Sequence, residues 1–98
     1  MTAESRQGIV DRISKLIVRY EASSIELQRL SREMKLLVNE LDEVSDHDWV
    51  AEIRWFWLQI EIVNASQLSN RRIEIDPVDQ EQIETSLKSI SALLCNQR

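Results

Sequence analysis

Apolar residues recur every three or four positions along the first 44 residues of the chain. Ser23 fills the one polar slot in this pattern, and the apolar positions are Ile9, Ile13, Leu16, Tyr20, Leu27, Leu30, Met34, Leu37, Leu41 and Val44. This alternation is a heptad repeat, which is typical of helices that pack along their length against other helices. Val10, Ile17 and Val38 widen the stripe on one side, which favours a bundle over a two-stranded coiled coil. The pattern predicts one helix over about residues 4–44.

A second helix is predicted over about residues 47–70. Asp46 or Ser45 can cap its start, because a side-chain oxygen there accepts hydrogen bonds from the first unpaired backbone amides. Ile53, Trp55 and Trp57 alternate with charged residues, a pattern that also suits a β-strand. The alternation is then lost, and no turn residue interrupts the run. The helix is therefore the favoured prediction.

A third helix is predicted over about residues 77–96. It starts at Asp76 and Pro77, which suit the N-cap and the first helical position. One narrow apolar strip follows, made of Ile83, Leu87, Ile90 and Leu94. Residues 71–75 are predicted to form a short extended connector. Because the chain has one glycine and one proline, it lacks the residues that hairpin turns need. We predict an all-α fold in a single domain spanning residues 1–98.

The predicted helix over residues 47–70 is apolar on two sides. One face carries Trp49, Ile53, Phe56, Ile60 and Val63, and the other carries Ala51, Trp55, Leu58, Ile62 and Ala65. Such a helix needs cover on both sides. We expect the N-terminal helix to cover the first face and the 77–96 helix to cover the second. In the alternative interpretation, Trp55, alone or with Trp57, is a partly exposed anchor for a protein partner, since tryptophan is enriched at interface hot spots.

The predicted helices differ in length, at about 60 Å for residues 4–44 and about 36 Å for residues 47–70. If the second folds back, it reaches only to about residue 20, and the aliphatic residues before that point stay uncovered. A second subunit would cover them. We therefore predict an antiparallel bundle completed by a homodimer, with an interface that includes Ile9, Val10, Ile13, Leu16, Ile17, Tyr20, Ser23, Leu27 and Leu30.

The alternative is a monomeric four-helix up-down bundle with a break near Ser23. The stretch Ser23-Ser24-Ile25-Glu26 matches a capping box, which marks the start of a helix. Four helices of similar length would result, as bundles prefer. However, the heptad crosses Ser23 without a change of phase, and neither glycine nor proline is present to turn the chain. These features favour the straight helix and the dimer.

The composition narrows the classes of partner. A net charge of −5 argues against nucleic-acid binding, which requires a concentrated basic surface. The chain has no apolar run long enough to span a membrane and no apolar segment typical of a secretory leader near its N-terminus. The lone Cys95 cannot form an internal disulfide, which fits a reducing compartment. We therefore expect a cytoplasmic protein that binds neither nucleic acid nor membrane.

Acidic residues gather between the first two predicted helices. They are Glu40, Asp42, Glu43, Asp46, Asp48 and Glu52, with no lysine or arginine among them. Those before Ser45 sit at a predicted helix C-terminus, where negative charge opposes the helix dipole. We interpret the cluster, together with His47 and Trp55, as a docking patch for a basic protein partner, where charge increases the association rate and specificity. A solvated helical hairpin would also account for it.

The sequence offers little that points to catalysis. His47 and Glu43 are spaced to share a metal ion, but neighbouring residues at a helix tip diverge, and a metal site needs several converging ligands. The single histidine has no partner that would form a nucleophilic site, and a glycine-rich phosphate loop is absent. We predict no enzyme activity, cofactor, metal or catalytic residue. The predicted function is a small acidic protein-binding module of toxin-neutralising, immunity or adaptor type. The alternatives are a structural or regulatory subunit of a larger assembly and a metal-dependent catalytic bundle.

Overall fold

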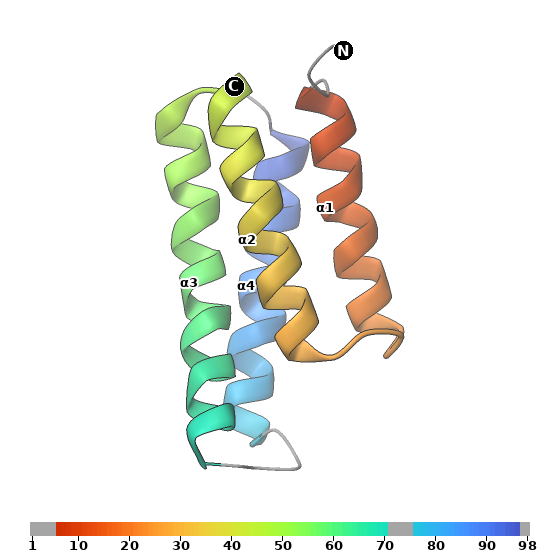
Figure 1. Cartoon of the computed structure of the whole chain (residues 1–98), viewed down its shortest axis with the longest axis vertical. Helices are drawn as coiled ribbons and strands as arrows, with labels where there is room; N and C mark the ends of the chain where they lie inside the picture. The colour runs from red at the N-terminus through yellow and green to blue at the C-terminus, as the bar shows by residue number, and fades with distance from the viewer. Residues whose placement is uncertain (1–5, 71–75, 97–98) are drawn as a thin grey trace.

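The computed structural model describes residues 6–70 and 76–96 and forms a four-helix bundle (Figure 1). Its helices are α1 (Arg6–Glu21), α2 (Leu27–Val44), α3 (His47–Asn70) and α4 (Pro77–Cys95). They run alternately up and down, and the described residues contain no strand. The predicted all-α bundle is thus confirmed, and the strand alternative around Ile53 to Trp57 is wrong. The connector predicted at residues 71–75 lies outside the described residues.

The straight helix predicted over residues 4–44 is wrong, because the chain turns back between α1 and α2. Ser23 has a φ of 61°, the one positive φ among the described residues. The Ser24 amide donates to the Arg19 carbonyl at 2.8 Å, and the Ser23 amide donates to the Tyr20 carbonyl at 3.0 Å. These two bonds form a Schellman motif, which ends a helix by satisfying its last carbonyls. The predicted alternative, a break near Ser23 within a four-helix bundle, is what the chain adopts.

The capping box predicted at Ser23 does not form. The N-cap of α2 is Glu26, whose extended backbone precedes Leu27, and no side chain caps the first turn. A capping serine would have to stand next to the first helical residue, whereas Ser23 is three residues away from Glu26. Ser23 therefore ends α1 and does not begin α2.

Replacing Ser23 by glycine is expected to stabilise the fold. A left-handed conformation costs a residue with a Cβ about 1 kcal/mol, and glycine adopts it without that cost. We expect Ser23→Gly to raise the free energy of unfolding by about 0.5–1 kcal/mol and Ser23→Val to lower it by at least about 1 kcal/mol. Urea unfolding followed by circular dichroism measures both. Ser24→Gly is the matched control, since Ser24 has no positive φ; a gain as large as that of Ser23→Gly would contradict the assignment.

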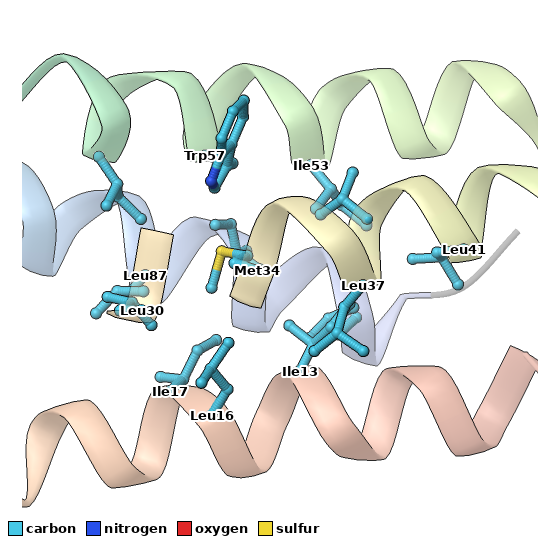
Figure 2. Close-up of a cluster of buried hydrophobic side chains, with 14 of the residues drawn as sticks. Ile13, Leu16, Ile17, Leu30, Met34, Leu37, Leu41, Ile53, Trp57 and Leu87 are labelled. Atoms are coloured by element: carbon cyan, nitrogen blue, oxygen red, sulfur yellow. The ribbon is translucent and has the colours of Figure 1, made fainter. Parts of the chain in front are cut away.

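A single hydrophobic core takes side chains from all four helices (Figure 2). In the figure, Ile13 of α1 lies near Leu37 of α2, while Trp57 of α3 points toward Met34 of α2. Six aliphatic residues of α1 are expected from the sequence to need a second subunit, and five of them are buried within one chain: Ile9, Val10, Ile13, Leu16 and Ile17. The sixth, Val18, is 64% exposed. The chain itself therefore covers most of the surface that the dimer was expected to cover.

The residues predicted for a dimer interface mostly lie in this core. In addition to the α1 set, Leu27 and Leu30 are buried, Tyr20 is partly buried, and Ser23 is exposed at the turn. Because the chain itself covers them, the reasoning that led to a dimer through the N-terminal helix no longer applies. A dimer formed by these residues stays a prediction, and because most of them are buried in the single chain, their arrangement does not support it.

Two of the three tryptophans belong to the core. Trp49 is fully buried and Trp57 is 8% exposed. Each buried indole finds a backbone acceptor, since Trp49 Nε1 donates to the Leu93 carbonyl and Trp57 Nε1 donates to the Ser31 carbonyl, both at 2.9 Å. These bonds link α3 to α4 and to α2. The interpretation of the aromatic residues as core is confirmed for Trp49 and Trp57.

The order of the helices around the bundle gives α3 an outer face. In the described part of the chain, the backbone of α1 lies close to α2 and α4 but not to α3, so α1 and α3 lie on a diagonal. One side chain crosses it, because the Arg6 guanidinium lies over the Trp49 ring at 5.1 Å from the ring centre. The α3–α4 hairpin also extends past the turn between α1 and α2 (Figure 1). Consequently the side of α3 that points away from α1 has no helix of this chain against it.

Candidate protein-interaction surface

The outer side of α3 carries an exposed apolar stripe. Trp55 is 60% exposed, Ile62 is 61% exposed and Leu58 is 40% exposed. Ala51 and Ala65 are also exposed and continue the same heptad spacing toward the two ends of the helix. Monomeric soluble proteins seldom leave several large apolar side chains together on one helix face. We call these five residues the α3 face.

Polar side chains border the α3 face on both sides. Arg54 and Glu61 lie on the side of α2, where Arg54 donates to the Asn39 side chain at 3.1 Å and Glu61 accepts a hydrogen bond from the buried Ser31 hydroxyl. Glu52 and Gln59 lie on the side of α4 by their helical positions, and Gln59 accepts a bond of 3.3 Å from Gln82 of α4. An apolar centre with a polar border is the usual anatomy of a protein interface.

A shallow apolar depression lies beside Trp55. Its lining comes from Ala51, Glu52, Trp55 and Phe56 of α3 and from Leu93 of α4. Phe56 and Leu93 are partly buried against the core, so the base of the depression is fixed. Such a rigid hollow next to a protruding indole can receive an aliphatic side chain from another protein.

The expectation that the 77–96 helix covers the α3 face is wrong. α4 packs with α2 against the opposite face of α3, where Trp49, Ile53, Ile60 and Val63 are buried. The apolar strip of α4 is narrow and can cover only one surface. Both faces of α3 were correctly identified from the sequence, but the exposure of Leu58 and Ile62 was missed. The sequence did contain a signal for this exposure. α3 has two apolar faces, and the single narrow strip of α4 cannot bury the second of them.

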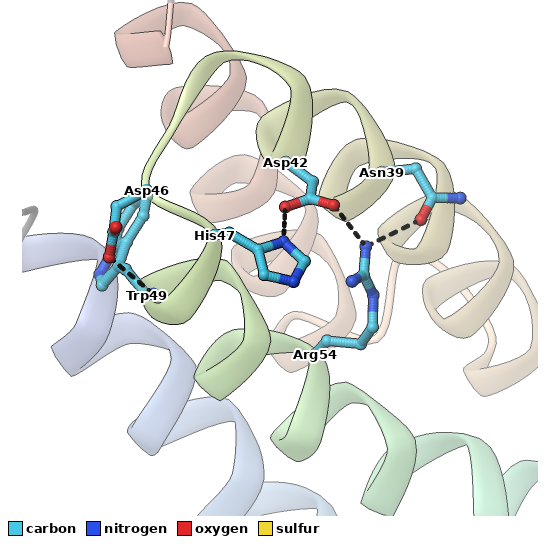
Figure 3. Close-up of polar contacts among 6 residues, drawn as sticks. All are labelled: Asn39, Asp42, Asp46, His47, Trp49 and Arg54. Atoms are coloured by element: carbon cyan, nitrogen blue, oxygen red, sulfur yellow. Dashed lines mark hydrogen bonds and ion pairs between the residues drawn. The ribbon is translucent and has the colours of Figure 1, made fainter.

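The acidic tip is largely an internal polar network (Figure 3). Of the two predicted caps, Asp46 is the one that caps α3, and it accepts the Trp49 amide at 3.1 Å. Asp42 accepts His47 Nδ1 at 2.9 Å and lies 3.8 Å from a terminal nitrogen of Arg54. The same nitrogen of Arg54 donates to Asn39. Asp42 and Asp46 therefore hold the connection between α2 and α3.

Of the remaining acidic residues, one pairs with α1 and three are exposed. Glu40 lies 3.5 Å from the Arg12 guanidinium, so it forms an ion pair with α1. Glu43, Asp48 and Glu52 are exposed. These three carboxylates lie at the end of the bundle from which the α3 face begins, and they give that end a negative charge. We call them the acidic end.

The tip does not assemble a metal site in the described part of the chain. There, no group of three or more histidine, cysteine, aspartate or glutamate side chains is arranged to hold a metal ion. His47 instead turns its Nδ1 atom to Asp42 (Figure 3). The pairing of His47 with Glu43, considered from the sequence, is not among the contacts of the tip.

An open groove of about 1250 Å³ lies where the α1–α2 turn meets the longer α3–α4 hairpin. Tyr20, Asn64, Glu84 and Lys88 contribute to its mixed lining. Burial raises the pKa of the Tyr20 hydroxyl above its ordinary value, and the nearby Glu84 carboxylate raises it further. The groove shows no convergence of ligands or nucleophiles, and so the α3 face is the stronger candidate.

None of the helices in the described ranges has the length and apolar character that a bilayer crossing requires. Comparison of the chain with protein families, curated proteins and solved structures found no match. The function must therefore be argued from the surface itself.

Proposed function

We propose that this protein is a non-enzymatic binding module whose working surface is the α3 face together with the acidic end. The observation that carries the proposal is the exposure of Trp55, Leu58 and Ile62 at heptad spacing on one helix. Burying such side chains against another chain gains about 1.5–3 kcal/mol for each large residue, which is the main driving force for association. Tryptophan at the centre of such a patch is the residue type most often found to dominate binding.

In this proposal the acidic end directs a basic partner to the module. Glu43, Asp48 and Glu52 are exposed beside the start of the α3 face, and the chain has a net charge of −5. Complementary charge raises association rates and rejects wrong partners more than it adds affinity. A partner with a basic surface next to apolar side chains fits both parts of the surface.

A toxin-neutralising, immunity or adaptor protein of the cytoplasm has this physical character. Such proteins need a rigid binding surface, and the four-helix bundle supplies one with little cost in conformational entropy on binding. The alternative is a structural or regulatory subunit of a larger assembly, favoured by the heptad spacing of the α3 face, which is typical of helix-to-helix packing.

The proposal is tested by quantitative capture from the cells that make the protein. The tagged full chain serves as bait, in wild-type form and as the double variant Trp55→Ser/Ile62→Ser. We expect the double variant to capture at least about tenfold less of its specific partner, because two large apolar contacts are removed. A second variant, Glu43→Lys/Asp48→Lys, is expected to lower capture of a basic partner most strongly at low salt.

The matched control is Val18→Ser/Val78→Ser. Val18 is 64% exposed and Val78 is 74% exposed, and both lie outside the α3 face. Circular dichroism checks that all variants keep their helicity. If the α3 variant retains every protein captured by the wild type, the α3 face is not the binding surface and the proposal fails.

A further inference from the structure

The α3 face has the spacing of a coiled-coil seam, and we propose that a second copy of this chain fills it. This inference rests on the proposed function, because it names the occupant of the apolar part of that surface, the α3 face, and leaves the acidic end to the basic partner. The spacing from Ala51 to Ala65 alternates four and three, and the side chains in between are Trp55, Leu58 and Ile62. The seam is about 21 Å long. Two such seams pack as knobs into holes when the flanking side chains allow it.

The side chains that border the seam select an antiparallel arrangement. Arg54 and Glu61 lie seven residues apart on the same edge of α3. When two copies of α3 run antiparallel about an axis between Phe56 and Trp57, each Arg54 lies on the same edge as the Glu61 of the other copy and is displaced from it by about 3 Å along the axis. Two reciprocal ion pairs then close one side of the seam, as a two-fold symmetric interface requires.

The same arrangement matches large side chains with small ones. Each Trp55 lies opposite Leu58 of the other copy, and each Ala51 lies opposite Ile62. On the other edge Glu52 faces Gln59, so no like charges meet there. Complementary volumes in facing layers let two helices interdigitate without voids.

Other arrangements of the two copies are less favourable. Sliding the antiparallel pair by one heptad brings Glu61 opposite Glu61, and like charges in direct opposition are repulsive. A parallel pair places Arg54 opposite Gln59 and Glu61 opposite Ser66, so it forms no ion pair. The sequence of the border therefore favours one register.

The antiparallel arrangement also separates the acidic ends. In the proposed register the two Asp48 residues are offset by about 25 Å along the helix axis. This exceeds the screening length of about 8–10 Å at moderate salt, so the two negative ends repel each other little. A parallel pair would put them side by side. The two acidic ends then lie at opposite ends of the dimer, and each can meet a basic partner.

The contacts of Arg54 within its own chain still allow it to form the ion pair with Glu61 of the second copy. Both contacts, with Asn39 and with Asp42, use one terminal nitrogen, and a guanidinium carries several further N–H donors. The Arg54 side chain is 32% exposed. It can therefore hold the tip of its own chain and pair with Glu61 of the second copy.

Cysteine cross-linking tests the register directly. Ala51→Cys and Ile62→Cys are made separately in a Cys95→Ser background, because Cys95 is exposed. When the two variants are mixed and oxidised, we expect a disulfide between one copy of each. Either variant alone is expected to cross-link at least about tenfold less, since its own cysteines are about 16 Å apart along the axis in the proposed dimer.

Charge reversal provides a second test that needs no oxidation. Arg54→Glu and Glu61→Arg each create two like-charge contacts in a homodimer, and each is expected to weaken self-association by about tenfold. Mixing the two variants makes both contacts complementary again, so a heterodimer is expected to form. Sedimentation equilibrium of chains with different tags measures it, and circular dichroism checks the fold of each variant.

The outcomes separate this inference from the proposed function. A cross-link specific to the mixture, with rescue by mixed charges, supports the second copy. A wild-type chain that stays monomeric up to millimolar concentration, or cross-links formed equally by each single variant, overturns it. If either of these results is found while Trp55→Ser/Ile62→Ser still fails to capture a protein that the wild type captures, the proposed function stands without the dimer. If that variant loses nothing, both fail.

Discussion

Trp57→Ala is expected to lower the free energy of unfolding by about 3–5 kcal/mol. Trp57 is 8% exposed and fills the space between α2 and α3 (Figure 2), and its indole N–H is bonded to the Ser31 carbonyl. The substitution leaves a large cavity and removes that bond. For a small domain whose total stability is about 5–15 kcal/mol, this loss leaves the fold marginal. Urea unfolding followed by circular dichroism measures the change.

Trp55→Ala is the matched control on the same helix. The same side chain is removed two residues away, but Trp55 is 60% exposed in the single chain. At concentrations where the chain is monomeric, we expect a change within about 0.5 kcal/mol. Equal losses for the two variants would contradict the assignment of Trp57 to the core and of Trp55 to the surface.

Ile13→Asp is expected to destabilise the bundle by about 4 kcal/mol or more. Ile13 is fully buried in α1, and an unpaired carboxylate at such a position loses its hydration without compensation. Burial raises the pKa of the introduced carboxyl above its unfolded value of about 4, so the folded state binds the proton more tightly. The variant is thus expected to be least destabilised at about pH 4 and to lose stability as the pH rises through the folded pKa.

Val18→Asp is the control that separates the effect of burying a carboxylate from the effect of adding a negative charge to α1. Val18 lies in the same helix and is 64% exposed, so a carboxylate there remains hydrated and is expected to change stability by less than about 0.5 kcal/mol. Both variants are measured by urea unfolding at two pH values. If Val18→Asp were as damaging as Ile13→Asp, then α1 would not pack in the orientation described.

Helix starts were predictable where a local chemical rule decides them. Asp46 accepts the amide of Trp49, and Asp76 accepts the amide of Val78 at 3.0 Å. In both cases the residue type and its place before an apolar pattern sufficed to set the boundary. The core positions of α2 from Leu27 to Leu41 followed from the heptad spacing for the same reason, because burial on one face imposes a period close to that of the helix. Val44, the last position of the pattern, is 40% exposed.

The turn at Ser23 could not be settled by such a rule. A Schellman motif usually places glycine in the left-handed position, and serine there gives almost no signal in the sequence. The heptad pattern is also the same on both sides of Ser23, so it fits a straight helix and a folded hairpin equally. The choice depends on how much of the apolar surface of residues 9–17 the rest of the chain can bury. The length of α3 alone suggested that it could bury little of it, but α2 and α4 also pack against α1.

The position of the candidate site was only partly predictable. Trp55 and the acidic residues were identified by type, but the tip network uses Asp42, His47 and Arg54 internally. Ion pairs depend on the relative placement of helices, which the sequence does not specify residue by residue. Arg12 of α1, for example, lies 3.5 Å from Glu40 of α2, and this pair depends on how the two helices are displaced along each other.

The continuity of the heptad through Ser23 means that α1 could make the same contacts with α2 of a neighbouring chain. What keeps α1 on its own chain is the tether of five residues between Glu21 and Leu27. A tether this short holds the two helices at an effective concentration on the order of millimolar. Exchange of α1 between chains therefore needs local protein concentrations of that order, and in more dilute solution each chain closes on itself.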